Sequence, residues 1–163
     1  MTGLEISLSR SRSRNLTVFA TLLSMIAPFS INTYMPSFPD IEAEFGISRA
    51  MLSQSLAVYL LAFAISMLFW GPLADRFGRR LVLFVSMAIY SVASIGCALA
   101  DSADSFLFLR IVQGLTASGG VVAARAMIRD ANSPEDARRA MSQVVLYFAL
   151  APAIAPLLGG WLH

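Results

Sequence analysis

An arginine and a glutamine stand inside an apolar stretch of the chain, where polar side chains are costly. Arg110 lies near the start of the stretch 105–128, and Gln113 follows three residues later on the same face of a helix. A guanidinium keeps its charge in proteins, and placing it at the centre of a bilayer costs at least about 2.5 kcal/mol. Arg110 therefore either extends to the lipid headgroups or faces a polar interior, and the nearby amide favours the interior. We therefore expect Arg110 and Gln113 to face a cavity between helices.

The composition indicates that a membrane is the solvent for the elements that position these residues. Hydrophobic residues make up 57% of the 163 residues and charged residues 13%, whereas soluble domains average roughly 25% charged. This balance excludes a soluble enzyme, a secreted disulfide scaffold and a disordered chain. A single cysteine cannot form an intramolecular disulfide, and the net charge of +2 gives no reason to expect nucleic acid as a partner.

Five apolar stretches are long enough to cross about 30 Å of hydrocarbon as helices. They lie at 15–38, 50–70, 81–100, 105–128 and 141–162. We predict an all-α integral membrane bundle of five transmembrane helices over residues 15–163, after an amino-terminal tail of residues 1–14. The tail resembles the charged start of a signal peptide. The apolar run that follows is too long for one and lacks a small-residue cleavage site, so we expect a retained first helix.

Arginines are distributed unevenly over the ends of these predicted helices. One side of the bundle receives the following: Arg10, Arg12, Arg14, Arg76, Arg79, Arg80, Arg125, Arg129, Arg138 and Arg139. The other side receives Arg49 together with most of the acidic residues of the connections. Because cytoplasmic loops are enriched in arginine and lysine, we predict a cytoplasmic amino terminus.

The connection between the second and third stretches contains charges and glycines in a defined order. Gly71 ends a helix, Gly78 permits a tight turn, and Asp75 is placed to pair with a neighbouring arginine. A topology signal alone would need only scattered arginines. We therefore interpret the segment as a charged contact, the loop latch, which consists of Gly71, Asp75, Arg76, Gly78, Arg79 and Arg80.

The last apolar stretch and its approach contain helix signals of two kinds. Ser133 is placed as an N-cap before Pro134, and this pattern favours a short cytoplasmic helix over a solvated acidic turn. Farther along, two prolines remove backbone donors and two glycines permit close helix contact. Both residue types are common in membrane helices, but their paired spacing favours a bent helix that moves. We name these four residues the gate motif: Pro152, Pro156, Gly159 and Gly160.

Several of these segments together resemble one family of transporters. The run from Gly71 to Leu83 is similar to the loop signature of the major facilitator superfamily, Gly-x-Leu-Ala-Asp-Arg-x-Gly-Arg-Lys/Arg. Arg110-Ile-Val-Gln-Gly114 is similar to the Arg-x-x-Gln-Gly signature of its drug:proton antiporters. The gate motif lies in a segment similar to the antiporter signature Gly-x-x-x-Gly-Pro-x-x-Gly-Gly, with alanines at the first two glycines. With Tyr34-Met-Pro-Ser-Phe-Pro39, the pattern is closest to the Bcr/CflA-type multidrug resistance branch.

The resemblance implies proton-coupled efflux of small amphipathic drugs or metabolites across the bacterial inner membrane, with antibiotic resistance as the outcome. It implies a coupling role for Arg110, and it singles out Asn32 and Tyr34 after the first span. The family usually has an aspartate at the position of Asn32, which cannot titrate. The proton carrier is then Asp40, Asp75 or a residue outside this chain, and the positive charge in the membrane favours neutral or anionic substrates over cations. Tyr59 and Tyr147, near the middle of their spans, are further candidates for a cavity.

The length of the chain distinguishes the remaining hypotheses about its function. Facilitator transporters have two six-helix halves with the substrate site between repeats. Five helices amount to a partial amino-terminal half, and we expect it to be inactive as a transporter by itself and to require its carboxy-terminal half. The alternative is a non-transporting interaction or regulatory module that pairs with a complete transporter, another membrane protein. A small homodimeric exporter is disfavoured, because no span contains a carboxylate. We expect no enzymatic activity, no catalytic residue, no cofactor and no metal.

Overall fold

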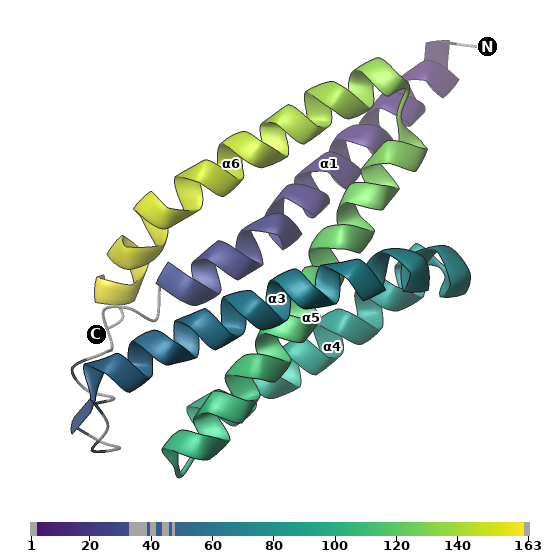
Figure 1. Ribbon diagram of the computed structural model, residues 1–163. Helices are drawn as coiled ribbons and strands as arrows, with labels where there is room; N and C mark the ends of the chain where they lie inside the picture. Colours follow the sequence, from purple (N-terminus) through teal and green to yellow (C-terminus); the bar gives the residue numbers. More distant parts are fainter. Residues whose placement is uncertain (1–2, 33–38, 40–41, 44–45, 47, 162–163) are drawn as a thin grey trace.

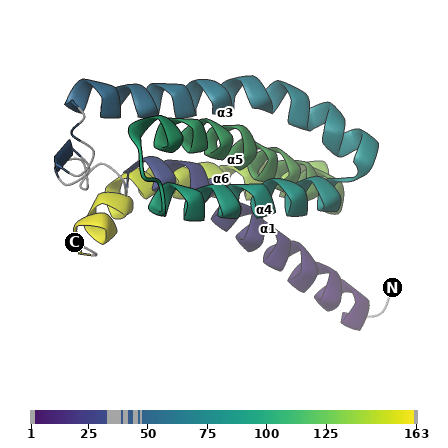
Figure 2. The same ribbon diagram turned by 90° about the horizontal axis from the view of Figure 1, so that it is seen from below.

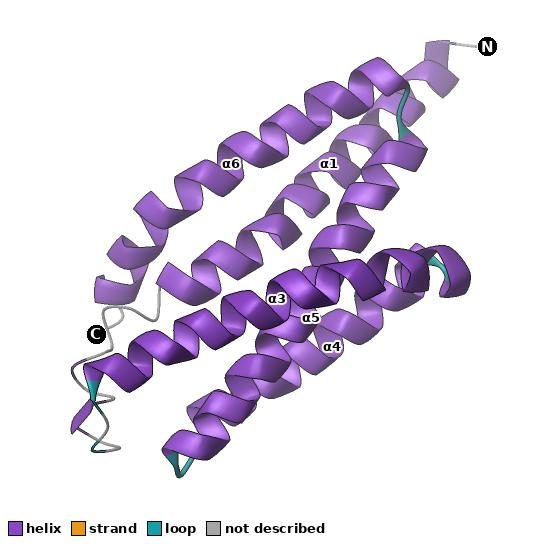
Figure 3. Cartoon of the chain, viewed as in Figure 1, coloured by secondary structure: helices purple, strands orange, loops and turns teal. Residues whose placement is uncertain are grey.

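The computed structural model is a bundle of long helices (Figure 1; Figure 3). It describes the backbone of residues 3–32, 39, 42–43, 46 and 48–161, and the side chains of these residues except 3–14, 151, 153 and 155–161. The helices within these ranges are α1 (Gly3–Asn32), α3 (Arg49–Phe77), α4 (Arg79–Ala98), α5 (Ala103–Ala131) and α6 (Pro134–Trp161). The all-α fold class predicted from the sequence is therefore confirmed.

α1, α3, α5 and α6 are longer than the apolar stretches that predict them, whereas α4 has the same length as its stretch. α1 begins at Gly3, so most of the segment expected as a tail is helical and continuous with the first span. Four helices of the described part, α1, α3, α4 and α5, are long and apolar enough to cross a membrane. The fifth predicted span lies within α6, which begins at Pro134 and so includes the predicted short cytoplasmic helix without a break.

α5 is the central helix because small side chains let its neighbours approach closely. Figure 2 shows α5 between α3 and α4, and it also contacts α1 and α6. Its face toward α3 and α4 is buried and contains Gly114, Ser118, Gly119 and Gly120. The Ser118 hydroxyl lies 2.6 Å from the Ser66 hydroxyl of α3. Small residues at helical spacing are thus used for packing, which is typical of helix contacts in membranes.

Successive helices run in alternating directions, so the predicted arginine-rich connections meet at one end of the bundle (Figure 1). The turn between α3 and α4 lies beside the end of α5, where Arg79 pairs with Asp130. α6 begins here with the predicted N-cap, since the Ser133 hydroxyl accepts a 3.2 Å hydrogen bond from the Asp136 amide. We name this end, which joins the 77–79 and 131–134 connections, the arginine-rich end.

An apolar cluster joins α1, α5 and α6 near the arginine-rich end. Its buried residues are Ala20, Ala124, Ile128, Ala137, Ala140 and Val144. Alanines predominate, so the three backbones pack closely there, with Leu16, Leu23 and Met141 at the margin. α1 is therefore held to α5 at this level by apolar packing.

The close approach of α5 to α3 predicts which glycine cannot carry a side chain. A Cβ at Gly114 would overlap the carbonyl oxygen of Tyr59 and lie 3.1 Å from the Ala62 Cβ. Since backbone atoms cannot move aside cheaply, Gly114→Ala should lower the free energy of unfolding by about 1–3 kcal/mol. Thermal unfolding of the purified protein in detergent measures this loss.

The matched control is Gly71→Ala in α3, where a Cβ meets open space. The control should leave the unfolding temperature unchanged or raise it slightly, because alanine favours a helix. Equal unfolding temperatures for the two variants would contradict the close packing of α3 on α5.

Candidate functional site

Arg110 lies inside the bundle, where its guanidinium contacts polar groups of two helices. The residue is 5% exposed. Nη1 lies 3.4 Å from the carbonyl oxygen and 3.5 Å from the hydroxyl of Ser30, in α1, and donates a 3.3 Å hydrogen bond to Oε1 of Gln113. The guanidinium carbon also lies 5.3 Å from the centre of the Phe106 ring, a cation–π distance. Arg110 therefore points into the bundle and is not directed to the headgroups.

A chain of hydrogen bonds fixes the amide of Gln113. Its Nε2 donates a 2.8 Å hydrogen bond to the Ser94 hydroxyl of α4. That hydroxyl in turn donates to the carbonyl of Tyr90, one turn earlier in α4, at 2.8 Å. With the amide nitrogen used by Ser94, the oxygen of Gln113 is left to accept from Arg110.

Tyr59 adds a polar group from α3. Its side chain is 1% exposed, and its hydroxyl lies near Ser30 without a hydrogen-bond partner among the described residues. The ring stacks on Phe63 with ring centres 6.5 Å apart. We name the cluster of Ser30, Tyr59, Ser94, Arg110 and Gln113 the polar cluster. It joins four helices, and its one charge is positive.

The two candidates near the end of α1 have different positions. Nδ2 of Asn32 donates a 2.7 Å hydrogen bond to the Pro28 carbonyl of its own helix. Tyr34 lies outside the described residues, as does Asp40. Tyr147, the other tyrosine considered for a cavity, is 47% exposed on α6.

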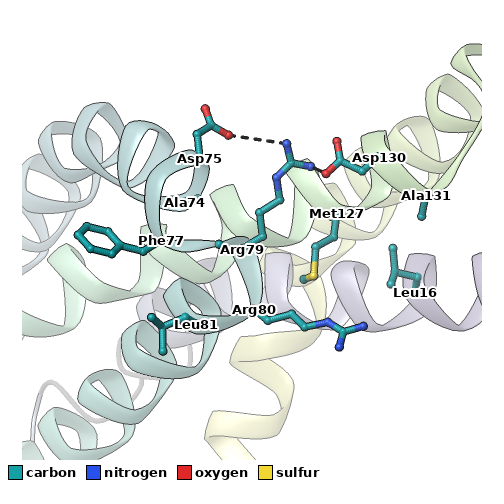
Figure 4. Close-up of a pocket in the computed structure, with 11 residues that line it drawn as sticks. Leu16, Ala74, Asp75, Phe77, Arg79, Arg80, Leu81, Met127, Asp130 and Ala131 are labelled. Atoms are coloured by element: carbon teal, nitrogen blue, oxygen red, sulfur yellow. Dashed lines mark ion pairs between the residues drawn. The ribbon is translucent and has the colours of Figure 1, made fainter.

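The loop latch lies at the arginine-rich end, and Arg79 is its centre (Figure 4). Nη2 lies 3.7 Å from the Asp75 carboxylate, and Nη1 pairs with Asp130 of α5 and donates a 2.7 Å hydrogen bond to the Ala126 carbonyl. Gly78 joins α3 to α4 with φ of +92°, a conformation that residues with a Cβ rarely adopt. The turn therefore presents Arg79 to the end of α5.

The other members of the loop latch do not make this contact. Arg76 is exposed and lies over the Phe77 ring at 5.4 Å, and Arg80 points away from both carboxylates (Figure 4). The prediction that Gly71 ends a helix is wrong: Gly71 lies within α3, which continues through Pro72 to Phe77 because a proline late in a helix can be accommodated there. A surface pocket of about 750 Å³ is lined by Asp75, Arg79, Arg80 and Asp130 together with apolar residues of α1, α4 and α5.

The gate motif lies in α6. Pro152 is exposed, and the helix continues past it to Trp161 without interruption. Pro156, Gly159 and Gly160 belong to the same helix, but their surroundings lie outside the described part.

These features define a multi-pass membrane protein with a buried cationic cluster and a charged turn at one end. Comparison with known proteins assigns the class: the family model of the Major Facilitator Superfamily matches residues 20–163. The chain belongs to this superfamily, so it is related to transporters and not to a family of enzymes.

Several similar proteins are named as drug-resistance proteins. The chain is 33% identical to the bicyclomycin resistance protein homolog of Haemophilus influenzae over 86% of its own length and 35% of the relative. It is 30% identical to multidrug resistance protein D of Escherichia coli, over 95% of the chain and 39% of that protein. It is 38% identical to multidrug resistance protein MdtL of Klebsiella pneumoniae, over 84% of the chain and 35% of the relative. The chain thus spans little more than a third of the length of these relatives.

Sequence reasoning missed three partners of its candidate residues. Ser30 and Ser94 contact Arg110 and Gln113 from other helices, and Asp130 pairs with Arg79 across the arginine-rich end. Serines are frequent in these helices, and most of the others bond to their own backbone, so no feature of the sequence selects these two. Asp130 offered the one available signal, because it is an acidic residue among arginines near the end of α5.

The contacts of Arg79 predict a stability difference between adjacent arginines. Arg79→Ala removes the ion pairs with Asp75 and Asp130 and the hydrogen bond to the Ala126 carbonyl. It should lower the free energy of unfolding by about 1 kcal/mol. Arg80→Ala removes an exposed side chain for which the described residues offer no ion pair, and it should change stability by less than about 0.5 kcal/mol. Unfolding in detergent compares the two, and a larger loss for Arg80→Ala would show that the turn packs differently.

Proposed function

We propose that this chain forms part of a proton-coupled exporter of small amphipathic compounds, with Arg110 as the coupling residue. The polar cluster is the observation that carries the proposal. A guanidinium buried among helices that cross the membrane is costly to keep, and such residues mark substrate or ion pathways. The drug-resistance names of the relatives support the efflux of drugs as the direction and kind of transport.

The charge of the polar cluster favours neutral or anionic substrates. Its members supply hydroxyl, amide and guanidinium groups and no carboxylate. A cationic substrate would meet the charge of Arg110 in a medium that screens it poorly. We therefore propose an amphipathic compound with an anionic or hydrogen-bond-accepting group.

The proton carrier lies apart from the loop latch. Asp75 is sixteen residues after Tyr59 in α3, so about 24 Å of helix separates it from the polar cluster. Asp75 is also exposed and paired with Arg79. We propose that the proton is carried by Asp40 or by a carboxylate of a segment that packs against this bundle, and that the loop latch and gate motif serve conformational change.

A substrate pathway needs more surface than these helices provide. Because the relatives are nearly three times as long as the matched region, we propose that residues 1–163 expressed alone do not transport. Efflux by cells that express this segment alone, compared with cells that express the full reading frame containing it, tests this statement.

Replacement of Arg110 tests the function directly. In the full reading frame that contains these residues, Arg110→Ala should reduce proton-driven efflux at least tenfold, because the charge that interacts with the proton carrier is lost. Arg110→Lys keeps the charge but lacks the planar donors that reach Ser30 and Gln113 together, so partial activity is expected. Efflux of a fluorescent amphipathic dye from energised cells measures both. Wild-type efflux by Arg110→Ala at equal protein level would refute the coupling role.

The orientation is tested by labelling the arginine-rich end, which we propose faces the cytoplasm of a bacterial inner membrane. Arg80 is exposed beside the turn, so Arg80→Cys in a Cys97→Ser background provides one accessible thiol. A membrane-impermeant maleimide should label it in inside-out vesicles and leave it unlabelled in intact cells. Asp101→Cys, in the turn at the other end, serves as the control with the opposite pattern. Labelling of Arg80→Cys in intact cells would reverse the proposed topology.

A further inference from the structure

We propose that Ser94 is a positioning residue for Arg110, acting through the orientation of the Gln113 amide. The inference rests on the proposed role of Arg110 in coupling and adds a helix, α4, to the site. Ser94 acts on the guanidinium through Gln113. It receives the hydrogen bond of Gln113 Nε2 at 2.8 Å, while Gln113 Oε1 accepts from Arg110 at 3.3 Å.

The Tyr90 carbonyl sets the direction of the hydrogen bonds that run from α4 to Gln113. The Tyr90 carbonyl can only accept, so the Ser94 hydroxyl donates to it and presents its lone pair to α5. That lone pair can only be met by a donor, so the amide nitrogen of Gln113 turns toward α4. The amide oxygen must then face Arg110. The Tyr90 carbonyl on the α4 side and the guanidinium on the other side therefore favour the same orientation of the amide.

Without the serine hydroxyl, the amide nitrogen of Gln113 would lose its acceptor on α4, and the bond to Arg110 would be left to hold the amide. The flipped orientation stays unfavourable, because it would direct the amide hydrogens at a guanidinium that is itself a donor. The amide would instead shift more freely, together with the guanidinium that it accepts from. The guanidinium would then occupy a wider range of positions, and a coupling residue displaced by about 1 Å can lose much of its effect.

Ser94 differs in this respect from the neighbouring serine of the same helix. Ser91 is exposed, and its hydroxyl donates to the Met87 carbonyl at 2.8 Å, one turn earlier. Ser94 makes the equivalent bond to its own helix and in addition receives Gln113 from α5. The pair therefore offers a test in which residue type, helix and backbone bond are matched and the contact to α5 is varied.

The test compares two kinds of transport by Ser94→Ala, with Ser91→Ala as the control, both in the full reading frame that contains these residues. Proton-driven efflux requires coupling, whereas downhill equilibration of the same dye in de-energised vesicles does not. We expect Ser94→Ala to lower the ratio of driven to downhill transport about fivefold, which is the effect of losing about one hydrogen bond. Ser94→Thr restores the hydroxyl and should recover most of the ratio, and Ser91→Ala should leave it unchanged.

A purely structural role gives a different pattern. If Ser94→Ala lowers both transport rates equally, or changes neither, the ratio is unchanged and the positioning role is refuted. If this variant does not reach the membrane, Ser94→Cys decides, because the thiol keeps the volume but accepts a hydrogen bond weakly; it should reduce the ratio, and a wild-type ratio refutes the role. This inference and the proposed function fail on different results. The inference fails if the ratio is unchanged in the Ser94 variants, whereas the proposed function fails if Arg110→Ala retains wild-type efflux.

Discussion

The solvation of a buried guanidinium sets the main constraint on this bundle. The charge of Arg110 needs polar partners, because an unsatisfied ion inside a protein is costly. Its partners include the Ser30 carbonyl, in the last described turn of α1, and the Gln113 amide. Carbonyls at a helix carboxyl end carry partial negative charge, which suits a cation. The position of α1 relative to α5 is therefore tied to the solvation of one side chain.

Small residues on α5 make this arrangement possible. Gly114 lies one residue after Gln113 and lets α3 approach so closely that a Cβ would overlap its backbone. The same approach brings Tyr59 next to the polar cluster, since Tyr59 supplies the carbonyl that Gly114 meets. Farther along α5, the Trp70 indole donates to the Leu115 carbonyl at 2.7 Å and its ring packs at Gly119. On α5, the residue that makes the polar contact, Gln113, is thus directly followed by Gly114, the residue that allows close packing.

The sequence predicted the fold and the interior placement of Arg110 better than it predicted the contacts. Long apolar stretches fix the helices because a bilayer demands satisfied backbone groups, and a lone arginine in such a stretch is conspicuous. The pairing of Asp75 with a nearby arginine was accessible because both lie within one turn. Ser94 and Asp130 were not, since their contacts join helices that are distant in sequence and depend on helix rotation, which periodicity in an almost uniformly apolar helix does not determine.

The hydrogen bonds around Arg110 are shorter toward α4 than toward α1. The bonds that hold Gln113 to α4 are 2.8 Å long, whereas those from Arg110 to α1 are 3.4 Å and 3.5 Å, near the limit for a hydrogen bond. Near the arginine-rich end, α1 is held to α5 by buried alanines instead. The bond from Arg110 to Gln113, at 3.3 Å, is nearly as long as its contacts to Ser30, although Gln113 itself is held firmly by α4. A group that accepts more closely from the guanidinium therefore competes with Ser30 and Gln113 alike, and the hydrogen bond to Ser94 keeps the amide in place during that competition.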